Sequence, residues 1–178
     1  AYRILSGRKK FSNLNICGLH IHIGSQITES APYVCAISRI ANFIQKIKKE
    51  GIKLDYLNIG GGLGIIYNKE TPQTAQEFAR KILPLLSKIE LKIILEPGRF
   101  IIGNAGILVT KVLYIKNTPK KKFVIVDAGM NDLIRPALYD AYHQIVPLHI
   151  TNSTLNKVDV VGPICESADF FAKDRPLA

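Results

Sequence analysis

The chain has 178 residues, of which 47% are hydrophobic and 21% are charged, enough apolar material for one ordinary core or for parts of two. No apolar run approaches the roughly 20 residues that cross a bilayer, which excludes a membrane-spanning protein. The net charge of +10 comes largely from short basic clusters without interleaved aromatic residues, which argues against a nucleic-acid partner.

Strands and helices are predicted to alternate in the first part of the chain. Residues 14–23 are rich in β-branched side chains and predict a strand. Apolar residues at helical spacing predict an amphipathic helix at 33–49, with Gly51 as its C-terminal cap. A second strand is predicted at 54–59.

The alternation continues with a second helix and a third strand. Thr74 followed by Glu77 forms a capping box that begins the helix, and Pro84 should kink or shorten it. The third strand is predicted at 91–96. The resulting order β-α-β-α-β predicts a parallel sheet with crossover helices, either an open doubly wound sheet or part of a barrel.

The pattern changes after Gly103. From there on the sequence predicts mainly short strands, at 107–115, 122–127 and 158–162, without a convincing amphipathic helix. We therefore expect an α/β part in residues 1–102 and a β-rich part in residues 103–178.

Polar residues follow the first predicted strand in the segment HIHIGSQ. His22 and Ser25 lie there, and an imidazole can stack on an aromatic cofactor ring, although a hydrogen-bonded core histidine is the more common outcome. Because side chains alternate along a strand, His20 and His22 share one face and Cys17 points to the other. This arrangement disfavours a zinc site, and we expect no metal.

Two further motifs follow the second and third strands. Glycines at a strand end, including Gly61 and Gly62, allow close approach to a phosphate, but a tightly packed turn explains them as well. Glu96 and Arg99 in the sequence EPGR stand where α/β folds place active sites, although an ordinary surface ion pair would give the same pattern.

The three cysteines are too few and too irregularly spaced for a disulfide framework. Cys17, Cys35 and Cys165 therefore indicate a reducing compartment, and we expect a cytoplasmic protein. Cys165 lies beside Glu166, and such a thiol can donate protons, whereas a buried inert cysteine is the simpler interpretation.

Taken together, the segments GLHIHIGSQIT, LNIGGGLG, LEPGRFI, DAGMNDLIRPALYDAYH and VGPICESADFFAKDR resemble the diaminopimelate decarboxylase family over nearly the whole chain. This family belongs to the fold type III, alanine-racemase-like enzymes that use pyridoxal phosphate. The resemblance implies that residues 1–102 are the last strands and helices of a TIM-type (β/α)8 barrel. It implies that residues 103–178 begin a C-terminal β domain, and that the enzyme is a homodimer with shared active sites.

The resemblance also implies roles for individual residues. His22 would stack on the pyridine ring, Glu96 would face its nitrogen, and Cys165 of the partner subunit would return a proton to the substrate carbon. Pyridoxal phosphate would be held by His22, Ser25, Gly61, Gly62, Glu96, Pro97, Gly98 and Arg99. The substrate meso-diaminopimelate would be held by Arg99, Arg135, Tyr139 and Glu166.

The sequence departs from the family because no lysine stands in the family's Y-A-x-K-A-like context of the Schiff-base lysine. We therefore expect this chain alone to be inactive. Related decarboxylases of ornithine, arginine or carboxynorspermidine, and a non-catalytic remnant, remain alternatives to the production of L-lysine.

Overall fold

The computed structural model describes residues 1–149 and 154–178, which divide into two compact units. Unit 1 consists of residues 1–66 and 70–106, and unit 2 of residues 67–69 and 107–178. None of the helices in the described ranges has the length and apolar character needed to cross a lipid bilayer.

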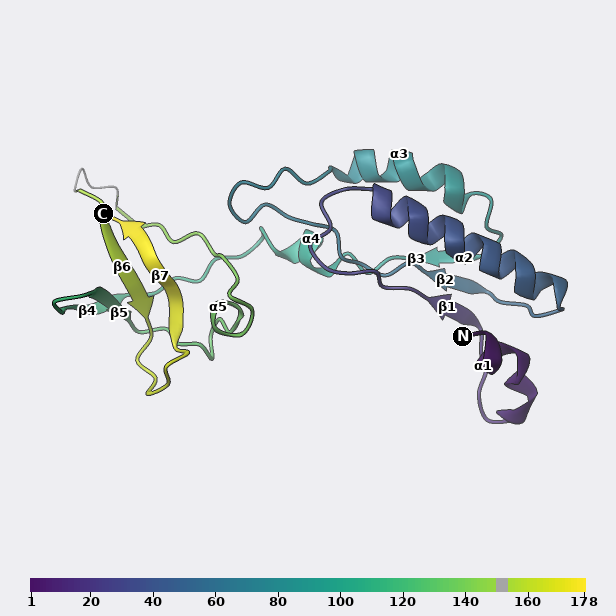
Figure 1. Ribbon diagram of the computed structural model, residues 1–178, viewed down its shortest axis with the longest axis horizontal. Coiled ribbons are helices and arrows are strands. Elements are labelled where there is room, and N and C mark those ends of the chain that lie inside the picture. Colours follow the sequence, from purple (N-terminus) through teal and green to yellow (C-terminus); the bar gives the residue numbers. More distant parts are fainter. Residues whose placement is uncertain (150–153) are drawn as a thin grey trace. The chain divides into compact units, whose positions relative to one another are not determined.

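Unit 1 contains a parallel sheet covered by two helices on one face (Figure 1). The strands pair in the order β1-β2-β3, so that β2 is central. The bounds of the elements are α1 Tyr2–Ser6, η1 Arg8–Lys10, β1 Gly18–His20, α2 Ala31–Lys49, β2 Tyr56–Asn58, α3 Ala75–Leu86, β3 Lys92–Ile94 and α4 Gly98–Ile102. The predicted helices and strands of this part are thus confirmed, with shorter strands than expected.

The core of unit 1 lies between the sheet and the two long helices. Leu57 of β2 is fully buried, and Leu19 and Ile93 of the neighbouring strands pack against the same cluster. The helices contribute a stripe of apolar side chains at helical spacing: Tyr33, Ile37 and Ile44 from α2, and Phe78, Ile82 and Leu86 from α3. The other face of the sheet carries no helix in the described part of unit 1.

The predicted capping box at the start of α3 is confirmed. Glu77 N donates to Thr74 Oγ1 at 3.2 Å, and Thr74 N donates to Glu77 Oε2 at 2.8 Å. Pro84 lies inside the helix, which ends two residues later at Leu86. Proline lacks the N–H that would bond to the carbonyl four residues back, so its place near the end agrees with the predicted shortening.

Unit 2 contains a four-stranded mixed sheet in the order β4-β5-β6-β7. The β4–β5 and β6–β7 pairs are antiparallel, and β5 and β6 are parallel. The elements are β4 Val112–Asn117, β5 Lys122–Val126, α5 Arg135–Tyr139, β6 Asn156–Val161 and β7 Phe170–Leu177. Val126, Val158, Val160 and Phe171 belong to a smaller core, and every residue of β4 is exposed. The sequence predicted β4, β5 and β6 but neither α5 nor β7.

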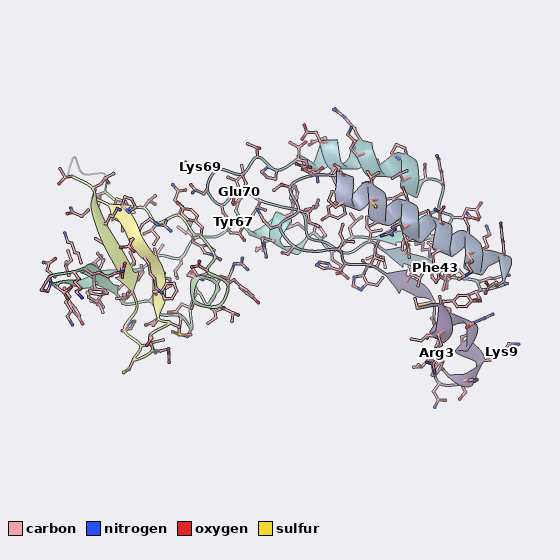
Figure 2. The ribbon with its side chains drawn as sticks, viewed as in Figure 1. Arg3, Lys9, Phe43, Tyr67, Lys69 and Glu70 are labelled. Carbon is pink, nitrogen blue, oxygen red and sulfur yellow. The ribbon has the colours of Figure 1, made fainter. Side chains whose placement is uncertain are left out.

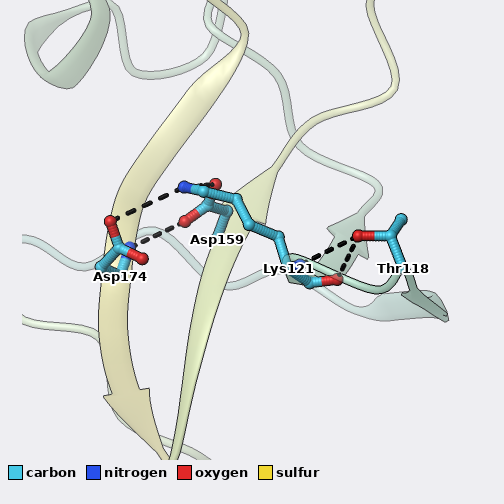
Figure 3. A network of polar contacts seen from close by, with 4 residues as sticks. All are labelled: Thr118, Lys121, Asp159 and Asp174. Atoms are coloured by element: carbon cyan, nitrogen blue, oxygen red, sulfur yellow. Dashed lines mark hydrogen bonds and ion pairs between the residues drawn. The ribbon is translucent and has the colours of Figure 1, made fainter.

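A charged network joins the β4–β5 turn to the last two strands (Figure 3). Lys121 Nζ lies 2.7 Å from Asp159 Oδ2 and 3.6 Å from Asp174 Oδ2. Asp174 N donates to Asp159 Oδ1, and Thr118 Oγ1 donates to the Lys121 carbonyl. The buried Asp159 carboxylate thus has a cation and a backbone donor. Hydrogen bonding to Lys121 and Asp174 outweighs burial and lowers the pKa of Asp159.

The expected barrel is a wrong prediction. In the described residues, unit 1 is an open three-stranded parallel sheet with β1 and β3 at its edges, and the chain as a whole is a mixed sheet fold. The β-α-β-α-β pattern specifies parallel pairing and crossover helices, but it carries no information on closure. Closure requires enough tilted strands for the last to pair with the first.

Candidate functional site

Strand register brings the polar side chains of unit 1 into one row. His20 pairs with Asn58, and Asn58 pairs with Ile94, at the carboxyl ends of β1, β2 and β3. The residues one position earlier pack on the helices, so this row points to the opposite face, where no helix covers it. His22 lies two residues after His20, and Glu96 lies two residues after Ile94.

The Glu96 carboxylate is anchored by two residues of the row. Asn58 Nδ2 donates to Glu96 Oε1 at 2.7 Å, and His20 Nε2 lies 3.7 Å from Glu96 Oε2. Asn58 is itself fixed, because its Oδ1 accepts a hydrogen bond from Gly60 N at 2.8 Å. Half of the Glu96 side chain is exposed. The carboxylate is therefore oriented by the sheet and still open to a ligand.

His22 is held beside the glycine loop. Gly61 N donates to His22 Nδ1 at 3.3 Å, and the imidazole is exposed. The flat ring can therefore contact a bound molecule without first leaving a packed core.

The glycine loop passes very close to the other two strand ends. A Cβ atom at Gly61 would lie 1.9 Å from the Glu96 carbonyl oxygen, and one at Gly62 would lie 2.0 Å from the Gly24 carbonyl oxygen. Gly62 also has a φ of +94°, which disfavours other residues. Packing alone therefore requires these two glycines, and the tight-turn interpretation of the sequence is correct. Their predicted contact with phosphate stays a prediction.

Gln26 connects the first turn to the arginine after β3. Its amide exchanges two hydrogen bonds with the backbone of Ile65, at 2.6 and 3.2 Å, and Arg99 Nη1 donates to its Oε1 at 3.4 Å. Ser25, directly before Gln26, is exposed, and Pro97 and Gly98 begin α4. Ser25 and Arg99 thus border one hydrogen-bonded frame.

In unit 2, Arg135 lies among aromatic side chains. Its Nη2 donates to Tyr67 Oη at 3.1 Å, and its guanidinium carbon lies 5.6 Å from the centre of the Tyr139 ring. Tyr67 belongs to the loop between β2 and α3 (Figure 2) and stacks edge-to-face on His143. Burial and the charge of Arg135 lower the pKa of His143. The result is a single cation that is oriented by two tyrosines.

Cys165 and Glu166 lie on an exposed loop that a buried carboxylate organises. Asp169 is 4% exposed and accepts hydrogen bonds from Met130 N at 2.6 Å and from Ile164 N at 2.7 Å. Cys165 has no disulfide partner and is exposed, so the prediction of a buried cysteine is wrong, and its role as a proton donor stays a prediction.

The structure brings some of the predicted site residues together and leaves others apart. His22 and Glu96 share one sheet edge, and Arg135 and Tyr139 share one short helix. Cys165 and Glu166 are neighbours on a separate loop of unit 2. The sequence analysis missed Asn58, Gln26, Tyr67 and Asp169. The two-residue period of β2 could have placed Asn58 on the face of the site, whereas no local pattern indicates the other three.

Comparisons with known proteins identify the family of the chain. Residues 15–178 match the family described as "Pyridoxal-dependent decarboxylase, C-terminal sheet domain". This match includes most of unit 1, so it also corresponds to a sheet domain rather than to a barrel.

Relatives with known names are similar over nearly the whole chain. The sequence is 48% identical over 169 residues to the diaminopimelate decarboxylase of Aquifex aeolicus. This alignment covers 94% of this chain and 40% of that protein. It is 48% identical over 166 residues to that of Vibrio cholerae, with coverage of 93% and 40%. The crystal structure of diaminopimelate decarboxylase from Helicobacter pylori complexed with L-lysine has a TM-score of 0.87 and 41% identity, and covers 99% of this chain and 44% of that chain. The chain thus spans less than half the length of these relatives.

Proposed function

The chain belongs to the family of pyridoxal-dependent decarboxylases, and we propose on this premise that it is part of a diaminopimelate decarboxylase, which converts meso-diaminopimelate to L-lysine and carbon dioxide. One observation carries the proposal: His22 and Glu96 converge with Asn58 on the open face of one sheet edge. The named relatives and the L-lysine complex of a similar structure support the choice of substrate.

The residues at this edge fit pyridoxal phosphate. When bound, its protonated ring accepts the electron pair that departing carbon dioxide leaves behind. The Glu96 carboxylate would hold the proton on the ring nitrogen, and its bond from Asn58 keeps it in place for this task. The exposed His22 imidazole would stack on one face of the ring.

The cofactor phosphate would be held where the glycine loop meets the two neighbouring turns. Ile27 N donates to the Gly62 carbonyl at 2.8 Å, and Glu96 N donates to the Gly60 carbonyl at 2.9 Å, so the three turns form one frame. Ser25, Gly61, Gly62 and the segment Pro97–Arg99 supply the hydroxyl, backbone and guanidinium donors that a phosphate requires.

Substrate recognition falls mainly to unit 2 in this proposal. Arg135 and Tyr139, together with Arg99 of unit 1, would bind the distal carboxylate, and Glu166 would bind the distal ammonium group. Tyr67 supports this role, because its hydroxyl fixes one nitrogen of the Arg135 guanidinium. An oriented arginine suits a carboxylate, which it can bind with two parallel hydrogen bonds.

We further propose that the protein acts as a cytoplasmic homodimer in which Cys165 delivers a proton to the partner's substrate carbon. The exposed position of Cys165 on a loop held by Asp169 supports this role. The three unpaired cysteines support a reducing compartment. We expect no decarboxylation by this chain alone, because none of its lysines stands in the family's Schiff-base context.

A chimera tests the proposal. The matching part of the Aquifex aeolicus relative is replaced by this chain, and carbon dioxide release is measured with meso-diaminopimelate, ornithine, arginine and carboxynorspermidine. We expect release from meso-diaminopimelate and formation of L-lysine. A correctly folded chimera that prefers another substrate of the panel would contradict the proposal.

Two variants of the chimera separate cofactor from substrate. Glu96→Gln should lower turnover more than tenfold, a loss above about 1.4 kcal/mol, while the cofactor stays bound. Arg135→Ala should raise the Michaelis constant and leave the absorbance spectrum of the bound cofactor unchanged. Unchanged turnover in the first variant, or an altered spectrum in the second, would show that the roles are misassigned.

A further inference from the structure

A carboxylate and two imidazoles meet at the open edge of the unit 1 sheet. His20, His22 and Glu96 each present one potential ligand atom, and these three atoms lie within 4.8 Å of one another. The sequence argument against zinc considered only Cys17 as a companion of the histidines. The third group, Glu96, follows β3 and lies more than seventy residues away in sequence, so no local motif reveals it.

We propose that this triad binds a divalent transition-metal ion such as Zn²⁺, with His20, His22 and Glu96 as its protein ligands. Two imidazoles and one carboxylate are donors that Zn²⁺, Ni²⁺ and Cu²⁺ accept, whereas Mg²⁺ and Ca²⁺ prefer oxygen ligands alone. Three protein ligands leave at least one coordination position for water.

The spacing requires only small movements of exposed side chains. Bonds of about 2.0–2.2 Å in a tetrahedral site place ligand atoms about 3.3–3.6 Å apart. His20 Nε2 and Glu96 Oε2 are 3.7 Å apart, and both side chains are about half exposed, at 53% and 50%. Changes in side-chain torsions can therefore bring the ligands to the ion without moving the strands.

The surroundings of Glu96 favour this arrangement. Asn58 holds Oε1 at 2.7 Å, which leaves Oε2 as the oxygen on the side of His20. Such hydrogen bonds from outside the ligand set orient a metal ligand and strengthen its binding. Coordination through His22 Nε2 would place the ring proton on Nδ1. The long 3.3 Å hydrogen bond from Gly61 N would then be lost, at a modest cost in affinity.

A consequence follows that rests on the proposed function. His22 and Glu96 are also the residues proposed to hold the cofactor ring, so the ion and the cofactor should exclude each other. A transition-metal ion at this edge would therefore act as a competitive inhibitor of cofactor loading.

The experiment titrates Zn²⁺ into the full chain by calorimetry, in a background with Cys17→Ser, Cys35→Ser and Cys165→Ser that removes thiol ligands. We expect one ion per chain and no comparable heat with Mg²⁺ or Ca²⁺. His20→Ala, His22→Ala and Glu96→Gln should each weaken binding at least tenfold. The matched control His149→Ala removes a histidine outside the triad and should bind as before.

Several outcomes would overturn the metal site: no binding, equal binding of Ca²⁺, or Zn²⁺ affinity that survives when His20→Ala, His22→Ala and Glu96→Gln are combined in one chain. Circular dichroism spectra show whether each variant keeps the fold, which we expect because the three side chains are exposed.

Competition is measured separately with deoxypyridoxine phosphate, which lacks the aldehyde and so forms no imine with surface lysines. Weaker binding of this probe in the presence of Zn²⁺ supports mutual exclusion. Undiminished binding contradicts it and points to an error in the proposed cofactor edge, while the Zn²⁺ titration by itself decides the metal site.

Discussion

Unit 1 and unit 2 position their candidate side chains by different means. In unit 1, parallel strands in register place His20 and Asn58 on one face, and Asn58 holds Glu96 just beyond the end of β3. In unit 2, the buried carboxylate of Asp169 connects the loop that carries Cys165 to the rest of the unit. In a sheet, many backbone hydrogen bonds together hold the side chains in place. A loop held by one buried carboxylate depends on that side chain alone.

The core of unit 1 is also larger than the core of unit 2. Among the described residues, ten buried side chains make up the main cluster of unit 1, and six make up that of unit 2. Unit 2 also exposes the whole of β4, including Val112, Leu113, Tyr114 and Ile115. We therefore expect unit 2 to exchange its backbone amide hydrogens faster, and each prediction below tests this contrast.

The largest effect should come from a cavity in unit 1. Leu57 lies in the central strand and is fully buried, so Leu57→Ala should cost about 2–5 kcal/mol of unfolding free energy. Peptide-resolved hydrogen exchange should show faster exchange in α2 and α3. Leu83→Ala is the matched control, because Leu83 is 58% exposed on α3 and should change little. Equal effects of the two substitutions would mean that this core does not hold the sheet.

The next effect tests the buried carboxylate of unit 2. Asp169→Asn directs an amide N–H at one of the two backbone donors, Met130 N or Ile164 N, which should cost about 1–3 kcal/mol. Exchange should rise around Cys165 and remain unchanged in unit 1. Asp140→Asn is the control, because Asp140 is exposed and its left-handed backbone conformation suits asparagine. A Cys165 loop that keeps its protection in Asp169→Asn would refute the comparison.

The sequence predicted the units unequally for a physical reason. Long amphipathic helices repeat their apolar spacing several times, so α2 and α3 were predictable, as was the cap at Thr74. The helices α4 and α5 have five residues each, too few for a period to show. The last strand, β7, contains Lys173, Asp174, Arg175 and Pro176, and this polar run with a proline is more typical of a loop than of a strand.

The candidate site was predictable where chemistry followed strand ends directly. His22 and Glu96 were found because the carboxyl ends of parallel strands meet at one edge. Tyr67 was missed because its partner Arg135 is 68 residues away in sequence. Asp169 was missed because one of its two backbone donors, Met130, is 39 residues away. Closure of a sheet depends on pairing between the strands at its edges. The alternation of strands and helices therefore could not distinguish an open sheet from a barrel.

Stability should respond to pH in opposite directions in the two units. Burial raises the pKa of Tyr33 from 10.0 to about 12, so its contribution to unit 1 is present below pH 10 and is lost as the pH rises towards 12. Burial and Arg135 lower the pKa of His143 from 6.5, so its contribution to unit 2 is present above pH 6.5 and is lost as the pH falls below it. Charging His143 is further opposed because its buried Nε2 has no hydrogen-bond partner among the described residues.

Hydrogen exchange at several pH values, corrected for the intrinsic rate, checks both directions. Tyr33→Phe should abolish the alkaline loss in unit 1, and His143→Phe should weaken the acid loss in unit 2. If both units lost protection together at each end of the range, the two titrations would not be local, and the contrast between the units would fail.

The smallest effect concerns the cap of α3. Thr74 Oγ1 accepts a hydrogen bond from Glu77 N, and Thr74→Ala removes this acceptor, which should cost about 1 kcal/mol. Thr74→Ser keeps a hydroxyl at the same position and should retain most of the stability. Because α3 also packs on the core through Phe78 and Ile82, the loss should appear as fraying of its first turn rather than as unfolding of unit 1. Exchange of the amides of residues 75–78 measures this fraying, and unit 2 should not respond. A loss of protection that spreads through α2 as well would show that unit 1 depends on one side chain, as the Cys165 loop does. The contrast between a unit held by many contacts and a loop held by one carboxylate would then fail.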